Sequence, residues 1–214
     1  MDYTHILWDF NGTILDDVSV GINAINVLLK RRKMPIISSQ EEYRAKFCFP
    51  VIDYYRKLGF DLQKERFEDI SVEWVKEYKH FLAQAGLRNG AKKALETIQN
   101  SGKKQLILSA TERKMLKTQL KSLKIESYFD DILALDDIYA AGKTELAKNW
   151  LEREKPGKAI IIGDTDHDYE TAKALSVDCL LIAGGHQSKQ GLMSLCPNTF
   201  DSIPEALASI GITI

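Results

Sequence analysis

The stretch Leu7–Asp17, LWDFNGTILDD, decides the fold of this 214-residue chain. It begins in a short apolar run, and Asp9 follows directly where that run ends. An Asn-Gly-Thr turn comes next, in which Gly12 can adopt backbone angles that other residues avoid. A short apolar strand that delivers a carboxylate into a turn is typical of an open parallel sheet that binds its ligand at the strand ends.

The rest of the chain repeats this pattern of short apolar runs. They are His5–Trp8, Lys104–Ser109, Ile132–Leu135, Ala159–Ile162 and Cys179–Ala183. Between and after them, helices are predicted near Lys143–Arg153, across Tyr169–Leu175 and over Pro204–Ile210. Continuous apolar strands that alternate with helices indicate a parallel sheet covered on both faces. The predicted fold class is therefore α/β, a Rossmann-like doubly wound parallel sheet.

Residues 16–85 carry helical spacing and no strand pattern. Apolar residues recur on one helical face at Val18, Ile22, Ile25 and Leu29, and again at Phe67, Ile70, Trp74, Tyr78 and Phe81. Ser39 and Glu42 have the spacing of a helix capping box. Residues 16–85 are therefore predicted to form an inserted α-helical domain, and residues 1–15 and 86–214 to form the α/β core domain.

Acids, a hydroxyl and an ammonium group follow the ends of the predicted strands. Asp9 and Ser109 close two of the apolar runs, and Lys143 follows a third at a short distance. Asp164 and Asp168 lie in GDTDHD, just after another run. These side chains are expected to converge, because the carboxyl ends of parallel strands share one edge of the sheet. Clustered carboxylates suit Mg²⁺, and a lysine with a hydroxyl suits a phosphate, so the residues indicate a Mg²⁺-dependent phosphoryl site with a carboxylate nucleophile.

Composition narrows the choice of partners. Lys and Arg total 29 and Asp and Glu total 30, a balance that favours neither a nucleic-acid surface nor a polybasic membrane anchor. Cys48, Cys179 and Cys196 form no CxxC pair, so neither a zinc site nor a disulfide framework is indicated. The first residues lack a signal-peptide pattern, and no apolar run has the length of a membrane span. We expect a cytoplasmic monomer or homodimer without nucleic-acid or membrane partners.

Four ordered motifs carry a resemblance to a known family. DFNGTILDD, ILSAT, the single Lys143 and GDTDHDYETAKA are similar, in this order, to the motifs of the haloacid dehalogenase superfamily of phosphatases. The resemblance covers the whole chain and is closest to the phosphoglycolate-phosphatase-like group. The helical insert stands where that superfamily carries a C1-type cap. The resemblance implies a Mg²⁺-dependent phosphatase that acts on a small phosphorylated metabolite through an aspartyl-phosphate.

The resemblance also implies a role for each matching residue. Asp9 would be the catalytic nucleophile, and Lys143 would bridge it to the phosphate and spread the transition-state charge. Mg²⁺ would be held by Asp9, the backbone carbonyl of Asn11, Asp164 and Asp168, the last as a direct ligand or as a partner of one. The phosphate would lie among Gly12, Thr13, Ser109, Ala110 and Lys143.

Asn11 departs from the family pattern, which has a second aspartate at this catalytic position. That aspartate protonates the leaving oxygen and then activates water, whereas an amide cannot relay a proton at neutral pH. General acid–base catalysis contributes roughly 10²–10⁴-fold, so slow turnover is expected. Three explanations stay open. The first is that His167 or Asp16 supplies the proton, and the second is that the leaving group needs little protonation, as in an acyl phosphate or pyrophosphate. The third is that the chain is a catalytically impaired phosphate-ligand binding or regulatory protein.

The insert would influence substrate choice by closing over the site. Tyr43, Arg44, Lys46 and Phe47 lie together on a segment that could face the substrate. Its two cations could meet a carboxylate or a second phosphate. The alternative is that this segment is a solvated helix face.

Overall fold

The computed structural model describes residues 2–136 and 142–214 and contains a six-stranded parallel sheet. The strands are β1 (His5–Trp8), β4 (Lys104–Glu112), β5 (Asp131–Leu135), β6 (Ala159–Gly163), β7 (Asp178–Ile182) and β8 (Thr199–Phe200). Their order in the sheet is β5-β4-β1-β6-β7-β8. The chain therefore passes to opposite sides of β1, and a crevice is expected at the carboxyl ends of β4, β1 and β6.

The register of β1 places the end of the first motif at this crevice. Trp8 is the last paired residue of β1 and lies beside Ile107 on one side and Ile162 on the other. The backbone N–H of Asp9 still donates to the carbonyl of Ile162, at 2.8 Å. The carboxylate of Asp9 is thus fixed one residue beyond the central strand.

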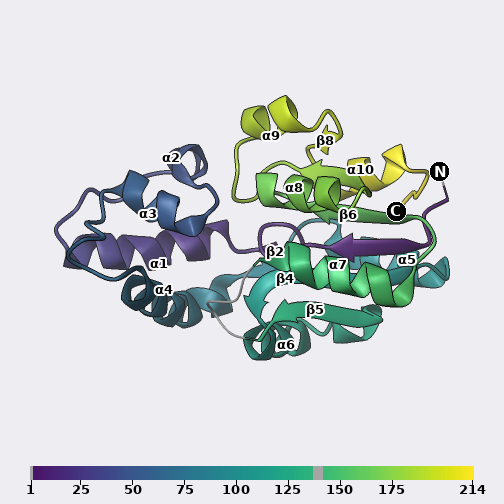
Figure 1. Ribbon diagram of the computed structural model, residues 1–214, viewed down its shortest axis with the longest axis horizontal. Helices are drawn as coiled ribbons and strands as arrows, with labels where there is room; N and C mark the ends of the chain where they lie inside the picture. The colour runs from purple at the N-terminus through teal and green to yellow at the C-terminus, as the bar shows by residue number, and fades with distance from the viewer. Residues whose placement is uncertain (1, 137–141) are drawn as a thin grey trace.

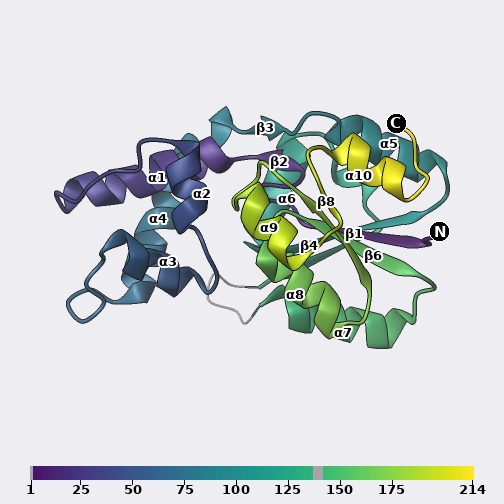
Figure 2. The same cartoon turned by 90° about the horizontal axis from the view of Figure 1, so that it is seen from above.

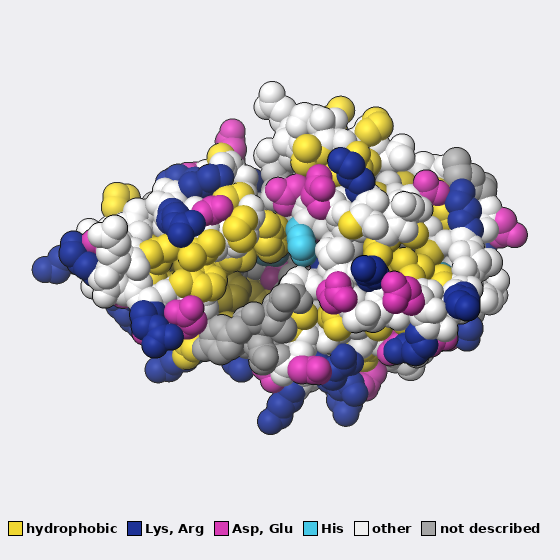
Figure 3. Space-filling model, viewed as in Figure 1, with side chains coloured by type: hydrophobic (Ala, Val, Ile, Leu, Met, Phe, Trp, Pro, Cys, Tyr) yellow, Lys and Arg dark blue, Asp and Glu magenta, His cyan; other side chains and the backbone are white. Residues whose placement is uncertain are grey.

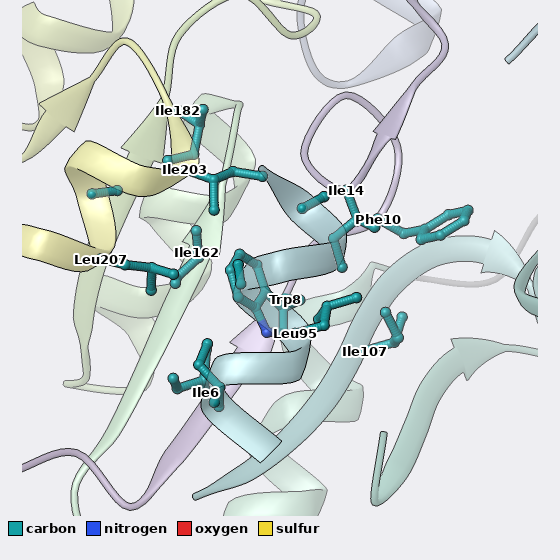
Figure 4. Close-up of a cluster of buried hydrophobic side chains, with 14 of the residues drawn as sticks. Ile6, Trp8, Phe10, Ile14, Leu95, Ile107, Ile162, Ile182, Ile203 and Leu207 are labelled. Carbon is teal, nitrogen blue, oxygen red and sulfur yellow. The ribbon is translucent and has the colours of Figure 1, made fainter. Parts of the chain in front are cut away.

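Helices cover both faces of the sheet (Figure 1). α5 (Ala91–Asn100), α6 (Arg113–Ser122) and α10 (Ile203–Ser209) pack on one face, and α7 (Lys143–Glu154), α8 (Asp166–Ala174) and α9 (Lys189–Leu195) on the other. A short 3-10 helix, η2, spans Glu126–Tyr128. Because successive strand residues point to opposite faces, Trp8 joins the core under α5 while Leu7 joins the core under α7. Figure 4 shows Trp8 among side chains that include Leu95, Ile162 and Leu207.

One buried polar pair lies inside this core. The indole N–H of Trp8 donates to the side-chain oxygen of Gln105 at 3.1 Å, and the Gln105 amide donates to the carbonyl of Leu95 at 2.9 Å. Both side chains are fully buried. These bonds tie β1 to β4 and α5, since a buried donor without a partner would be costly.

Residues 16–85, called the cap below, lie to one side of the sheet (Figure 2). The cap helices are α1 (Val18–Arg31), α2 (Gln40–Lys46), α3 (Val51–Leu58) and α4 (Phe67–Phe81), followed by the 3-10 helix η1 (Leu82–Gln84). β2 (Leu15–Asp16) pairs antiparallel with β3 (Gly86–Leu87) where the chain enters and leaves this region. The hydroxyl of Ser39 accepts from the N–H of Glu42 at 3.0 Å, as its capping-box spacing predicts. The division into two domains stays a prediction.

The α/β fold class and the parallel sheet are confirmed, and most strand bounds agree with the predicted ones within one residue. β4 is longer than predicted, because it continues past a register shift after Ser109 to Glu112. α5, α9 and β8 were not anticipated. No helix in the described ranges combines the length and hydropathy required to cross a membrane.

Candidate active site

Three buried carboxylates meet at the carboxyl ends of β1 and β6. Asp9 follows β1, Asp164 follows β6, and Asp168 lies in the first turn of α8. One oxygen from each lies within 4.8 Å of the others. Asp164 and Asp168 are fully buried, and Asp9 is nearly so. The structure thus brings Asp9 together with two acids that are far from it in the sequence, as predicted from their strand-end positions.

The electrostatics of these acids fit a cation. Burial raises the pKa of Asp9 well above its ordinary value; the charge of Lys143 opposes this, and the charges of Asp168 and Asp164 add to it. Burial also raises the pKa of Asp164; the charge of His186 opposes this rise, and the charge of Asp168 adds to it. A divalent cation between the carboxylates would offset both the burial and the mutual repulsion. Because all the side-chain donors are hard oxygens, the donor set suits Mg²⁺.

Lys143 is the counter-charge that the structure supplies. It is the first residue of α7, only 3% exposed, and its Nζ donates to Asp9 Oδ1 at 2.7 Å and to Asp168 Oδ1. Burial alone would lower the pKa of Lys143, but the charges and hydrogen bonds of the two carboxylates raise it overall. The ammonium therefore stays protonated beside Asp9, where it can face a phosphate.

Asp168 is held by donors on both oxygens. Its Oδ1 accepts a hydrogen bond from Lys143. Its Oδ2 accepts from the backbone N–H and the hydroxyl of Thr165, at 3.0 and 2.6 Å, and these bonds complete the capping box of α8. Burial would raise the pKa of Asp168, but Lys143 and Thr165 lower it overall. Gly163 leaves the space for this carboxylate, because a Cβ there would lie 2.0 Å from its Cγ. These contacts favour Asp168 as the residue that orients Lys143 rather than as a full metal ligand.

The turn after Asp9 is fixed against Asp164. The hydroxyl of Thr13 donates to Asp164 Oδ1 at 2.9 Å. Gly12 has a φ of +76°, and a Cβ there would lie 2.3 Å from Asp164 Oδ2, so both conformation and space require glycine. Arg88 donates to the carbonyls of Gly12 and Ala183, at 2.6 and 2.7 Å, and ties the turn to the end of β7. The contacts of Thr13 and Gly12 are thus to the acid cluster, while their predicted phosphate contacts remain predictions.

The register shift of β4 shapes the opposite wall. Ser109 is buried, and its hydroxyl accepts from the N–H of Thr111 at 3.1 Å. Ser109, Ala110 and Thr111 line the same pocket as Asp9 and Lys143. A buried hydroxyl and the backbone after it therefore line the pocket together with the acids, and their predicted contacts with a phosphate remain predictions.

Asn11 makes hydrogen bonds with both ends of its amide. Its Nδ2 donates to Asp17 Oδ2 at 2.8 Å and to the hydroxyl of Tyr78 at 2.9 Å. Its Oδ1 accepts from the hydroxyl of Thr111 at 2.7 Å. Tyr78 belongs to the cap and Thr111 to the core, so this amide joins the two regions across the mouth of the site.

Asp17 and His186 complete this junction. Asp17 is 1% exposed and accepts from the N–H of Gly12 and the hydroxyl of Tyr78, at 2.8 and 2.7 Å. Burial would raise its pKa, but His186, Tyr78 and Asn11 lower it overall. Nε2 of His186 lies 3.3 Å from Asp17 Oδ1. Burial alone would lower the pKa of His186, but the acids Asp17, Asp164 and Asp9 raise it to about 9.

Neither of these two residues was predicted from the sequence. Asp17 is the last residue of the first motif. His186 follows the carboxyl end of β7, and residues in such positions are candidates for the site of a parallel sheet. Asp16, considered as a proton source, is exposed on β2 and does not line the pocket. His167 does line the pocket, and burial lowers its pKa.

The cap supplies the outer wall of the pocket. The pocket holds about 200 Å³ and is lined by core residues of the site and by rings from the cap: Tyr43, Phe47, Phe49, Tyr54, Tyr55, Trp74 and Tyr78. Figure 3 shows hydrophobic side chains of the cap gathered beside the hollow between cap and core. Arg44 and Lys46 do not line it, because Arg44 bonds the carbonyls of Gly184 and Gly185 and Lys46 bonds a cap glutamate. In this structure neither cation faces the pocket, and a contact with the substrate remains untested.

Comparisons with known proteins agree with this geometry. Residues 6–182 match the family model described as haloacid dehalogenase-like hydrolase. Among curated proteins, the chain is 26% identical over 189 residues to the phosphoglycolate phosphatase of Aquifex aeolicus, covering 85% of each chain. It is 25% identical over 187 residues to a protein of Caldanaerobacter subterraneus subsp. tengcongensis named "Putative pyrophosphatase PpaX", covering 83% of this chain and 80% of that protein.

Solved structures show the same fold. The haloacid dehalogenase-like family protein SP0104 from Streptococcus pneumoniae superimposes with a TM-score of 0.82 at 23% identity, over 97% of this chain and 98% of that one. At this identity the likeness concerns the fold alone.

Proposed function

The chain belongs to the haloacid dehalogenase-like hydrolase family, and from that premise we propose that it is a Mg²⁺-dependent phosphatase. Its substrate would be a small phosphorylated metabolite, hydrolysed as a phosphomonoester through an aspartyl-phosphate on Asp9. The observation that carries the proposal is the buried set of Asp9, Asp164 and Lys143 at the carboxyl end of the central strands. The names of the phosphatase and pyrophosphatase relatives support the same chemistry.

Each residue has a task in this reaction. Asp9 presents its free carboxylate oxygen to phosphorus, because Lys143 holds the other oxygen at 2.7 Å. The hydroxyl of Ser109 and the backbone after it would receive the phosphate oxygens. Asp9, Asp164 and the Asn11 carbonyl would hold Mg²⁺, with Asp168 beside them. When bound, the ion supplies positive charge to the transferring phosphoryl group.

Asn11 limits the rate in this proposal. Its amide already uses Nδ2 and Oδ1 in bonds to Asp17, Tyr78 and Thr111, and it cannot exchange a proton at neutral pH. Protonation of the leaving oxygen and activation of water are therefore weak. We infer low turnover with esters whose leaving group requires a proton.

A second candidate function rests on the same amide. Because Asn11 is tied into the junction of cap and core, the site is also compatible with a phosphate-ligand binding or regulatory protein that is catalytically impaired. Such a protein would bind phosphate in the presence of Mg²⁺ without releasing product.

Two assays separate the candidates. Hydrolysis of p-nitrophenyl phosphate with and without Mg²⁺ tests turnover, because its phenolate leaves without much protonation. Rapid mixing with acetyl phosphate and Mg²⁺, followed by intact mass measurement, tests for an aspartyl-phosphate on Asp9. The phosphatase predicts Mg²⁺-dependent product and a transient phosphoenzyme, and the absence of both refutes it.

A further inference from the structure

The outer wall of the pocket is aromatic, and this bears on the substrate. The rings that form it are Tyr43, Phe47, Phe49, Tyr54, Tyr55, Trp74 and Tyr78. They pack against one another, with centroids 5.2 Å apart for Phe47 and Tyr54 and 5.4 Å apart for Phe47 and Phe49. The pocket holds about 200 Å³, and an apolar cavity of roughly 150 Å³ is enough for benzene. This volume includes the phosphate seat, so beyond the phosphate the pocket is large enough for one aromatic ring at most.

The cations that line the pocket are already bonded. Nζ of Lys143 lies between Asp9 and Asp168. Both ring nitrogens of His186 have partners, Nε2 with Asp17 at 3.3 Å and Nδ1 with the hydroxyl of Tyr43 at 2.8 Å. Neither side chain can turn toward a second anion without giving up a buried partner.

The cations nearby on the cap are bonded elsewhere. Arg44 donates to the carbonyls of Gly184 and Gly185, each at 2.8 Å, and Lys46 donates to Glu42 at 2.8 Å. The sequence of residues 137–141, DIYAA, contains no Lys, Arg or His. A carboxylate next to the phosphate, as in phosphoglycolate, would therefore meet rings and the imidazole of His167 rather than a free lysine or arginine among the described residues. A buried charge without an ionic partner is disfavoured.

The amide of Asn11 favours the same kind of substrate independently. With no proton relay at this position, the reaction depends on how well the leaving group carries negative charge. A phenol has a pKa of about 10, as in tyrosine, so a phenolate leaves phosphorus with far less protonation than an alkoxide. An aromatic leaving group thus fits the aromatic wall of the pocket and can also leave without a proton donor at position 11.

We propose that the preferred substrates are monophosphate esters of aromatic alcohols that carry no carboxylate near the phosphate, a proposal that rests on the phosphatase activity above. The ring lies against Phe47, Phe49 and Trp74. An oxygen of Asp9 attacks phosphorus, the bond from phosphorus to the aryl oxygen breaks, and the electron pair leaves with the phenolate, which takes a proton from solvent. Water then cleaves the aspartyl-phosphate to inorganic phosphate and regenerates Asp9.

Three esters separate ring recognition from leaving-group reactivity. Phenyl phosphate has both the ring and the good leaving group, benzyl phosphate has the ring with an alkyl leaving group, and phosphoglycolate has a carboxylate with an alkyl leaving group. Benzyl phosphate should exceed phosphoglycolate about tenfold in kcat/KM, mainly through KM. Phenyl phosphate should exceed benzyl phosphate in kcat/KM, which reports the step in which the leaving group departs.

Phe49→Ala tests the seat of the ring. Phe49 contacts the rings of Phe47 and His167 but belongs to none of the buried core clusters, so its removal should leave the fold intact. It should raise KM for phenyl and benzyl phosphate about fivefold. Val72→Ala is the matched control, because Val72 is 48% exposed on α4 and does not line the pocket. Thermal melting checks both variants.

The outcomes are distinct. The substrate proposal is overturned if phosphoglycolate equals or exceeds benzyl phosphate in kcat/KM, or if Phe49→Ala behaves like Val72→Ala, while Mg²⁺-dependent turnover persists. Absence of turnover with all three esters, together with no phosphoenzyme from acetyl phosphate, overturns the phosphatase itself and the substrate proposal with it.

Discussion

Replacement of Asn11 by aspartate would test the account of slow turnover most directly. The new carboxylate would stand where Nδ2 now donates to Asp17 Oδ2 at 2.8 Å. Two ionised carboxylates at that separation repel each other by about 6 kcal/mol at an effective dielectric constant of about 20. Because this is a large fraction of the stability of an ordinary domain, the variant should keep one proton on the pair near neutral pH.

That shared proton gives the variant a source of acid beside the leaving oxygen. Asn11→Asp should therefore raise kcat/KM for an alkyl ester such as benzyl phosphate about tenfold or more, within the range of general acid catalysis. Its folded-state pKa would be raised above the unfolded value, so its stability relative to the parent should fall as pH rises from 5 to 7, by up to about 1.4 kcal/mol per pH unit. Urea unfolding at both pH values measures this loss.

Asp17→Asn in the same background is the matched control. The amide at 17 can donate to the new carboxylate and favours its ionised form, so the double variant should lose both the pH dependence and the gain in rate. If Asn11→Asp gains no activity, or the double variant gains as much, while both still form the phosphoenzyme from acetyl phosphate, a shared proton at position 11 does not limit turnover and the reasoning fails.

Three further changes test other parts of the structure. Asp9→Asn should abolish the phosphoenzyme seen after acetyl phosphate while the melting temperature stays within a few degrees of the parent, as intact mass and thermal melting will show. Mg²⁺ should raise the melting temperature and a chelator should reverse this, because the ion offsets the repulsion among buried acids; Asp164→Asn should remove most of the response. Gln105→Leu should lower the free energy of unfolding by about 1–3 kcal/mol in urea, since the buried N–H of Trp8 loses its acceptor, whereas Gln63→Leu at an exposed position should change it little.

The sheet was predictable because its strands are buried on both faces and read as apolar runs. The runs at Ile132–Leu135 and Ala159–Ile162 correspond to β5 and β6 almost residue for residue. β8 was missed because two residues carry no periodic signal. α5 was missed although Ala91, Ala94, Leu95 and Ile98 have helical spacing and face the core, so the signal was present there.

The acid cluster was predictable for a different reason. Strand order places Asp9 and Asp164 at one edge whatever the loops do, and Lys143 follows from the first turn of α7. The partners of Asn11 were not predictable in this way. Its hydrogen bonds join it to Tyr78 and Thr111, which are distant in the sequence. The local sequence also does not indicate which of the neighbouring acids, Asp16 or Asp17, is buried.

The residues of α2 that face the pocket were also not predictable from the sequence alone. Tyr43 and Phe47 stand four residues apart, share one face of α2 and its end, and line the pocket. Arg44 lies one position on and points to the carbonyls after β7. A segment that carries rings and cations in adjacent positions therefore presents only the rings to the pocket, and the packing of α2 decides this.

Asn11 and Asp17 are best understood as one unit. An aspartate at 11 could still accept from the hydroxyl of Thr111, so that contact does not require an amide. The contacts with Tyr78 and Asp17 do require it, because Tyr78 already donates its one hydroxyl proton to Asp17 and the carboxylate of Asp17 needs a donor at 2.8 Å. The carboxylate at 17 is fixed in turn by Gly12, Tyr78 and His186. The departure from the family motif at position 11 is thus coupled to a buried charge that joins the nucleophile loop to the cap, and a change at either position should be judged with the other.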